Sequence, residues 1–150
     1  MSKKTGDLVL RRATIEDASL LLEWRNDRGT RNASQSTDEV SRDDHLAWLE
    51  RTLGDTSRQL FIAEERGSPV GTVRVDLDNG IHELAWTVAP HARGRGVARR
   101  MVAQVAAGIA GPLRAEIKVG NVASMRVAEH AGMQLERESD GVLHYARGMV

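Results

Sequence analysis

The chain has 150 residues, enough for one domain with its own hydrophobic core, and its 21 basic and 21 acidic side chains give a formal net charge of zero. This balance gives no overall attraction to nucleic acid or to acidic membranes, so neither is expected as a partner. The chain contains no cysteine, which excludes disulfides, thiolate metal ligands and a cysteine nucleophile. It has no apolar leader and no apolar run of about 20 residues, so we expect a cytoplasmic protein.

The first part of the chain predicts a short strand followed by two amphipathic helices. Thr14 and Asp17 have the spacing of a capping box, and an apolar helical segment that includes Trp24 follows them. Ser41 similarly precedes a helix whose apolar face includes Trp48. Both tryptophans are expected to anchor their helices in the core. The predicted elements are a strand over residues 8–12, a helix from 14 to 24, a polar loop over 26–40 and a helix from 41 to 53.

Strands dominate the rest of the chain. Asp78, Asn79 and Gly80 are a strong hairpin signal, so the strands that flank them are expected to be antiparallel. A helix separates the last strand of this group from the next one, so those two are expected to be parallel neighbours. The predicted elements are strands over 59–65, 70–77 and 81–88, a helix from 97 to 109, a strand over 113–119, a helix over 122–130 and strands over 133–138 and 142–147.

These elements predict one α/β (α+β) domain over residues 1–150, with a mixed, mostly antiparallel sheet of about seven strands and about four helices. The junction after the strand over 81–88 is its most informative part. A turn with Gly94 and Gly96 leads directly into a helix, and such a junction directs backbone N–H groups and a helix N-terminus at one point, where phosphate binds well. A dinucleotide-binding pattern would need a third glycine where Arg99 stands, and the Gly-Lys-Ser/Thr of a P-loop is missing.

Two motifs resemble the GNAT superfamily of N-acetyltransferases. Arg93, Gly96 and Ala98 spell an Arg-x-x-Gly-x-Ala pattern that resembles the acetyl-CoA signature of this family. The segment from Asn121 to Met133, an Asn-x-x-Ser helix that ends in Gly and an apolar residue, looks like its second signature. The predicted order of strands and helices also resembles the GNAT fold over nearly the whole chain.

The resemblance implies a site for acetyl-CoA as the donor substrate. Backbone amides of the turn would hold the pyrophosphate, and the two glycines of the turn would permit its close approach. The pantetheine arm would lie along the strand over 81–88 like an added strand, in a gap where this strand and the strand over 113–119 diverge. The residues implied in cofactor binding are Trp86, Thr87, Val88, Arg93, Gly94, Arg95, Gly96, Val97, Ala98 and Asn121.

The reaction that the resemblance implies needs a base for the acceptor amine and a proton donor for the departing thiolate. Glu83 resembles the catalytic glutamate that many family members carry on this strand; alternatively, it is a solvated carboxylate paired with Arg74. Ala128 replaces the tyrosine that is the usual acid, so Ser124 and Tyr145 are the candidate donors. Their alternatives are a helix-start hydroxyl and a packing residue, and the thiolate could also leave without an acid.

The first two helices and their connecting loop bind the acceptor in this superfamily. The Trp-Arg-Asn-Asp string and the later His-x-x-Trp-Leu helix resemble acetyltransferases of nucleotide-linked aminosugars and also those of ribosomal-protein N-termini. Three arginines here could pair with a diphosphate, or they belong to a solvated loop. We expect the primary amine of a small molecule such as a nucleotide-linked aminosugar, with a protein N-terminus as the alternative. The candidate acceptor residues are Trp24, Arg25, Asn26, Arg28 and Arg31.

The remaining expectations concern two histidines, metal binding, a non-catalytic alternative and the assembly. His45 and His130 are expected at the surface of their helices, and because no His/Asp/Glu set has ligand spacing, no metal is expected. The missing tyrosine at Ala128 keeps a different class open, a module that binds CoA without catalysis. The edge of the closing hairpin leaves a homodimer open.

Overall fold

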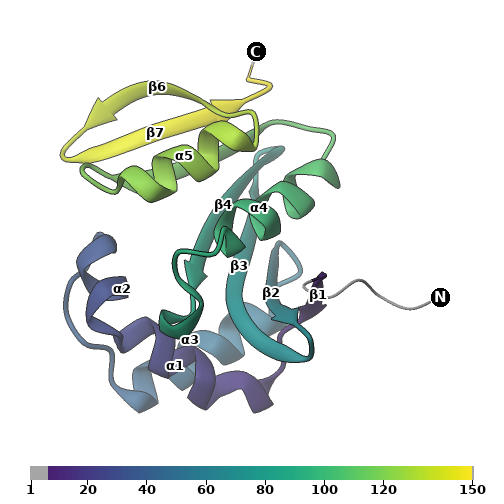
Figure 1. Cartoon of the computed structure of the whole chain (residues 1–150), viewed down its shortest axis with the longest axis vertical. Helices are drawn as coiled ribbons and strands as arrows, with labels where there is room; N and C mark the ends of the chain where they lie inside the picture. The colour runs from purple at the N-terminus through teal and green to yellow at the C-terminus, as the bar shows by residue number, and fades with distance from the viewer. Residues whose placement is uncertain (1–6, 150) are drawn as a thin grey trace.

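The computed structural model describes residues 7–149, and one sheet of seven strands forms its centre (Figure 1). The elements are β1 (Leu8–Arg12), η1 (Ile15–Asp17), α1 (Ala18–Asn26), α2 (Arg28–Ala33), α3 (Arg42–Gly54), β2 (Arg58–Glu65), β3 (Ser68–Asp78), β4 (Ile81–Val88), η2 (Pro90–Ala92), α4 (Val97–Ala107), β5 (Leu113–Lys118), α5 (Val122–His130), β6 (Gln134–Ser139) and β7 (Val142–Arg147). The strand order is β1-β2-β3-β4-β5-β7-β6. The N-terminal segment, where no apolar leader is predicted, lies outside the described residues.

The predicted mixed, mostly antiparallel sheet is confirmed. Strands β1 to β4 pair antiparallel in sequence order, and the β3–β4 turn has Asn79 and Gly80 at φ 53° and 79°, as a two-residue hairpin turn requires. Strand β5 pairs parallel with β4, as predicted across the intervening helix. On its other side β5 pairs with β7, so the last strand of the chain lies inside the sheet and β6 forms the edge.

Local capping residues explain where the first helices begin. The Thr14 hydroxyl accepts a hydrogen bond from the Glu16 N–H, and the Asp17 carboxylate accepts one from the Thr14 N–H, so the predicted capping box is formed. It opens a turn of 3-10 helix, and α1 follows. Ser41 caps α3 by accepting from the Asp44 N–H, also as predicted. None of the helices within residues 7–149 is long and apolar enough to cross a membrane.

The prediction of a loop over residues 26–40 is wrong in part, because residues 28–33 form α2, which makes five α-helices within residues 7–149. Asp27 is the N-cap of this helix, and its carboxylate accepts from the Thr30 N–H at 3.1 Å. The buried side chain of this helix is a threonine, Thr30, and the helix has no apolar residues at helical spacing by which a sequence pattern could indicate it. The sequence pattern therefore predicts a loop although the segment is helical.

The helices cover opposite faces of the sheet. A Cβ built on Gly71 of β3 would lie 2.9 Å from the Met101 sulfur of α4, so this face packs directly on α4. The neighbouring Arg74 faces the other way, with its guanidinium 5.9 Å from the centre of the Trp48 ring of α3. Side chains alternate along a strand, so β3 presents a packed face to α4 and a partly polar face to α3. The candidate site forms on this second face.

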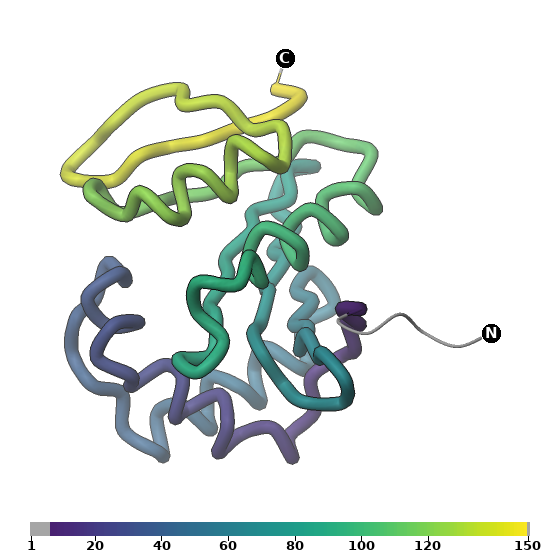
Figure 2. The backbone as a smooth tube through the Cα atoms, viewed as in Figure 1, coloured from purple at the N-terminus to yellow at the C-terminus, as the bar shows by residue number. Residues whose placement is uncertain are grey.

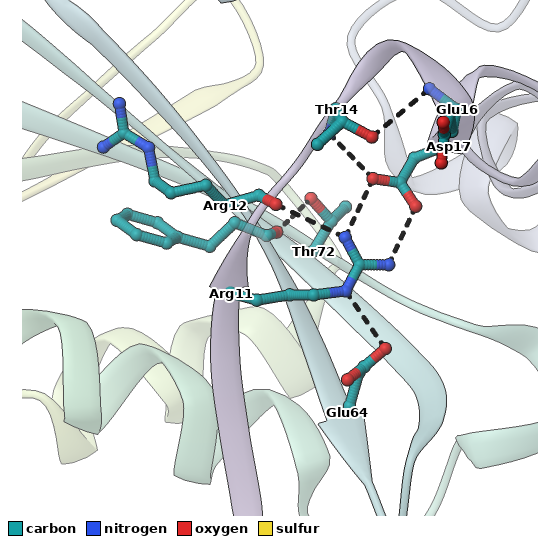
Figure 3. Close-up of polar contacts among 8 residues, drawn as sticks. Arg11, Arg12, Thr14, Glu16, Asp17, Glu64 and Thr72 are labelled. Atoms are coloured by element: carbon teal, nitrogen blue, oxygen red, sulfur yellow. Dashed lines mark hydrogen bonds and ion pairs between the residues drawn. The ribbon is translucent and has the colours of Figure 1, made fainter.

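A charged cluster fastens η1 to the first two strands (Figure 3). The Arg11 guanidinium donates to both oxygens of Asp17, at 2.9 and 2.8 Å, and to Glu64 on β2 at 3.0 Å. The Asp17 side chain is only 10% exposed. Its hydrogen bonds from Arg11 hold its pKa below the usual 3.8, against the opposing effect of burial. Paired, bidentate charges of this kind fix the start of the helical layer.

The substitution Asp17→Asn is expected to lower the free energy of unfolding at pH 7 by about 2 kcal/mol, because a buried charge-assisted pair is lost. A carboxyl whose pKa is depressed on folding stabilises the fold above its ordinary pKa and loses that effect as the pH falls. The difference between variant and wild type should therefore shrink below about pH 3.8. Urea unfolding across this range measures it, with exposed Glu16→Gln as the control. A difference in the free energy of unfolding that stays constant down to acid pH would contradict a stabilising role of the ionised Asp17 carboxylate.

Candidate functional site

A cavity of about 530 Å³ opens on the face of the sheet that α1 and α3 cover. Its walls come from α1, the segment after α2, α3, the strands β2 to β5 and the start of α5. The lining residues are Leu21, Trp24, Arg25, Ala33, Ser34, Gln35, Ser36, Val40, His45, Trp48, Leu60, Thr72, Arg74, Leu84, Ala85, Trp86, Thr87, Glu116, Ile117, Lys118, Asn121 and Ser124.

The cavity exists because β4 and β5 separate. Their parallel register contains two pairs, His82 with Leu113 and Glu83 with Arg114. Beyond these pairs both strands continue, and residues 85–87 and 116–118 line the cavity from its two sides. The divergence predicted for these strands is therefore present. On the side of β4 that faces β5, the backbone from Leu84 onward has no paired strand among the described residues. Such a free strand edge can accept an extended ligand.

The glycine turn after β4 forms an anion cradle at the start of α4. Gly94 and Gly96 have φ values of 80° and 73°, the left-handed region that glycine adopts without strain. Gly96 is the N-cap of α4 and offers no capping side chain, so within the described residues the first N–H groups of α4 receive no side-chain cap. Unsatisfied N–H groups and the helix dipole together favour a bound phosphate. In Figure 2 the turn descends toward α1 and α2.

The arginines around the cradle are held by carboxylates. Arg93 forms an ion pair with Asp27 and donates to the Thr30 hydroxyl at 3.2 Å, so it joins the turn to α2. Its guanidinium lies against Gly29, where a Cβ would come within 2.8 Å of it. The hydrogen bond from Arg93 to the Asp27 carboxylate is the main cause of the lowered pKa of Asp27. With Arg93 turned toward α2, its guanidinium is engaged there, and the backbone N–H groups of the turn stay the part predicted to bind phosphate.

Arg95 and Arg100 both pair with Glu65 at the end of β2, at 3.2 and 2.8 Å. Arg100 is the main cause of the lowered pKa of Glu65. This carboxylate ties the turn and the first helical turns of α4 to the neighbouring strand. The cradle is thereby fixed on both sides before any ligand arrives, which reduces the entropic cost of binding.

Glu83 lies at the closed end of the gap between β4 and β5. Its carboxylate accepts a hydrogen bond from the Arg114 side chain at 2.7 Å, whereas Arg74 pairs with Asp76. The alternative prediction that Glu83 pairs with Arg74 is therefore wrong. Glu83 is outside the set of described residues that line the cavity, but it lies two positions before Ala85 and so shares the face of β4 that carries Ala85. Its role as a base stays a prediction.

The two candidate proton donors lie in different environments. Ser124 lines the cavity beside Asn121, which caps α5 by accepting from the Ser124 N–H at 3.2 Å. Tyr145 is 1% exposed, packs within the core and is outside the described cavity lining. Burial raises its pKa. The structure brings Ser124, Asn121, Trp86 and Thr87 together, and it leaves Tyr145 apart.

Of the five predicted acceptor residues, Trp24 and Arg25 line the cavity. Asn26 instead bridges to the backbone of Val40 through two hydrogen bonds of 2.8 Å. Arg31 donates to the Asn26 and Thr37 carbonyls, which shapes the segment after α2. Arg28 is exposed. The three arginines therefore do not converge on one anion.

The expectation that His45 is a surface residue is wrong, because it is 5% exposed and lines the cavity next to Trp48. Burial, with Arg25 as a second cause, lowers its pKa, so its imidazole is neutral at pH 7. His130 is exposed, as expected. Trp24 is buried in the core as predicted, and it also forms part of the cavity wall.

Sequence reasoning missed the polar side chains that β5 and the segment after α2 contribute, among them Glu116, Lys118 and Gln35. One signal for the first two was present. In β5 the apolar Ala115 and Ile117 alternate with charged residues, so the charged set shares one face. For Gln35 there was no signal, since the polar segment around it has no periodicity.

The model of the acetyltransferase (GNAT) domain family matches residues 7–134 of the chain. No match was found among curated protein sequences. Similar solved structures include spermidine N-acetyltransferase from Vibrio cholerae in complex with CoA and spermine, at TM-score 0.81 and 18% identity over 93% of this chain and 94% of that one. Another is ribosomal-protein-alanine N-acetyltransferase from Brucella melitensis, at TM-score 0.78 and 24% identity over 94% and 99%.

An aminoglycoside acetyltransferase in complex with coenzyme A is also similar, at TM-score 0.80 and 17% identity over 95% of each chain. At these identities the structures establish a common fold. The family model covers most of the chain and establishes the family. The chain belongs to the GNAT family of acetyl-CoA-dependent N-acetyltransferases.

Proposed function

We propose that this enzyme transfers the acetyl group of acetyl-CoA to a primary amine of a small molecule, by direct attack of the amine on the thioester. The observation that carries the proposal is the divergence of β4 and β5, which opens a cavity along the strand that leads into the anion cradle. The backbone of residues 93–97 would hold the pyrophosphate, and the free edge of β4 near Trp86 and Val88 would hold the pantetheine arm. Arg95 and Ala98 would support this cradle rather than contact the acetyl group.

An amine with a lysine-like pKa of about 10.4 is neutral in about one molecule per thousand at pH 7.4, which costs about 4 kcal/mol. Glu83 is proposed to offset part of this cost by taking the proton, directly or through one water. The Arg114 side chain holds the Glu83 carboxylate in place at 2.7 Å. The new C–N bond forms as the C–S bond breaks, and the Ser124 hydroxyl is the proposed donor to the thiolate because it lines the cavity.

The small-molecule acceptor is supported by the cavity of about 530 Å³, to which side chains of α1 and α3 contribute one wall. The sequence resemblance suggests a nucleotide-linked aminosugar. The second candidate is a protein N-terminus, because the similar structures include a ribosomal-protein-alanine N-acetyltransferase. Two other similar structures carry names of small amine acceptors, spermidine and aminoglycosides.

The release of free CoA from acetyl-CoA is expected to rise above background with a UDP-aminosugar and to stay at background with N-terminal peptides. A cavity of about 530 Å³ suits a compact amine that reaches the gap between β4 and β5. A thiol reagent measures the released CoA, and mass spectrometry identifies the acetylated product. Turnover of peptides alone would reject the small-molecule acceptor, and background release with every amine would reject this mechanism.

A further inference from the structure

We infer that the acceptor carries an oxyanion, a carboxylate or a phosphate, and that Arg25 binds it inside the cavity. The inference rests on the proposed function, because it concerns the acceptor of that same site. Arg25 is the single residue of the three predicted acceptor arginines that lines the cavity. Its neighbours there are the neutral His45 and the Trp24 and Trp48 rings.

The guanidinium of Arg25 has unused hydrogen-bonding capacity. Its Nη2 donates to the Ser36 carbonyl at 3.3 Å. Its Nη1 is buried and has no hydrogen-bond partner within residues 7–149. A buried charged donor without a partner is costly, and an oxyanion from a ligand would satisfy it. Guanidinium groups also match the planar geometry of carboxylate and phosphate oxygens.

The charge of the cavity favours the same class of ligand. Among the described lining residues, three carry a positive charge, Arg25, Arg74 and Lys118, and one is a carboxylate, Glu116. Arg74 is paired with Asp76, and Lys118 donates to the Asn32 carbonyl. Among the described lining cations, Arg25 is the one with a buried nitrogen, Nη1, that has no hydrogen-bond partner within residues 7–149.

Glu116 is also engaged. It accepts from Gln35 at 3.4 Å and lies 3.6 Å from the His144 ring nitrogen. A single, partnered carboxylate does not suit a polycation, which needs several acidic side chains. The acceptor is therefore expected to differ in charge from spermidine, while the phosphates of a nucleotide-linked sugar fit the inferred class.

Binding can be measured without turnover, because all three tryptophans of the chain, Trp24, Trp48 and Trp86, line the cavity and their fluorescence reports its occupancy. The probes are two matched pairs of amines, glucosamine with glucosamine 6-phosphate and 4-aminobutanol with 4-aminobutyrate. Wild type is expected to bind the anionic member of at least one pair roughly tenfold more tightly. The pair that shows the preference identifies the oxyanion as phosphate or carboxylate.

Arg25→Gln should abolish this preference, Arg25→Lys should keep part of it, and Arg51→Gln on the exposed side of α3 should keep all of it. Thermal melting of each variant shows whether it is folded, and the lysine variant serves if the glutamine variant is not. Equal affinities within both pairs, tighter binding of spermidine, or a preference that survives in Arg25→Gln would overturn the inference. CoA release, measured in parallel, tests the proposed function separately.

Discussion

Replacing Glu83 by glutamine is expected to lower kcat roughly 10²- to 10⁴-fold, the usual contribution of a positioned general base. The amide keeps the size of the side chain and can still face Arg114, but it cannot accept the proton that the acceptor nitrogen must lose to attack the thioester. The KM for acetyl-CoA should stay near the wild-type value, because the cradle at residues 93–97 is unchanged. Steady-state kinetics measure both quantities.

Two further variants make this result specific. Arg114→Gln removes the side chain that orients Glu83 at 2.7 Å, and it should reduce kcat less than Glu83→Gln does. Glu50→Gln, an exposed carboxylate on α3, should leave kinetics unchanged. Full activity of Glu83→Gln would show that the base is another group. Glu116 would then be the first residue to substitute, as the carboxylate that lines the described cavity.

Replacing Gly96 by valine is expected to raise the KM for acetyl-CoA roughly 10- to 100-fold. The loss of one hydrogen bond to a charged phosphate costs about 1.5–3 kcal/mol, which corresponds to that range. Within residues 7–149, apart from its chain neighbours and its own helix, no atom lies within 4 Å of a Cβ at this position, so the side chain would enter open space at the turn. The φ of 73° also strains any residue other than glycine, at a cost of about 1–2 kcal/mol in stability.

Gly67 provides the matched control. It has a φ of 77° in the exposed turn between β2 and β3, and a Cβ there also meets nothing within 4 Å. Gly67→Val should therefore lose stability in the same way and keep the wild-type KM. If both variants show the same KM, the turn at Gly96 does not hold the pyrophosphate. Thermal melts and acetyl-CoA titrations of the two variants separate strain from lost binding.

Much of the fold could be predicted because its signals are local in the chain. The capping box at Thr14 and the turn glycines act within a few residues of where they stand, so β4 and α5 are found at their predicted bounds. The cradle is likewise a local structure, since one strand, one turn and one helix start form it. The family resemblance rests on the same local motifs.

The environments of several candidate site residues could not be predicted in this way. His45 is buried because α3 lies against the sheet, and its polar neighbours in sequence give no sign of that. Arg93 was expected to bind the pyrophosphate through its backbone, and nothing local indicated that its guanidinium reaches Asp27, which is 66 residues away in the chain. Tyr145 is in the core because β7 inserts between β5 and β6. Each of these outcomes depends on a contact between distant segments.

The sequence by itself thus determined the family and most of the elements, with α2 as the exception, because helix caps, turns and strand patterns are fixed by neighbouring residues. The tertiary structure alone decided which charges face the cavity. It paired Glu83 with Arg114, drew Arg31 and Asn26 into supporting the segment after α2, and left Arg25 with a buried donor. The physical reason is that the partner of a charged side chain depends on which distant segments packing brings beside it.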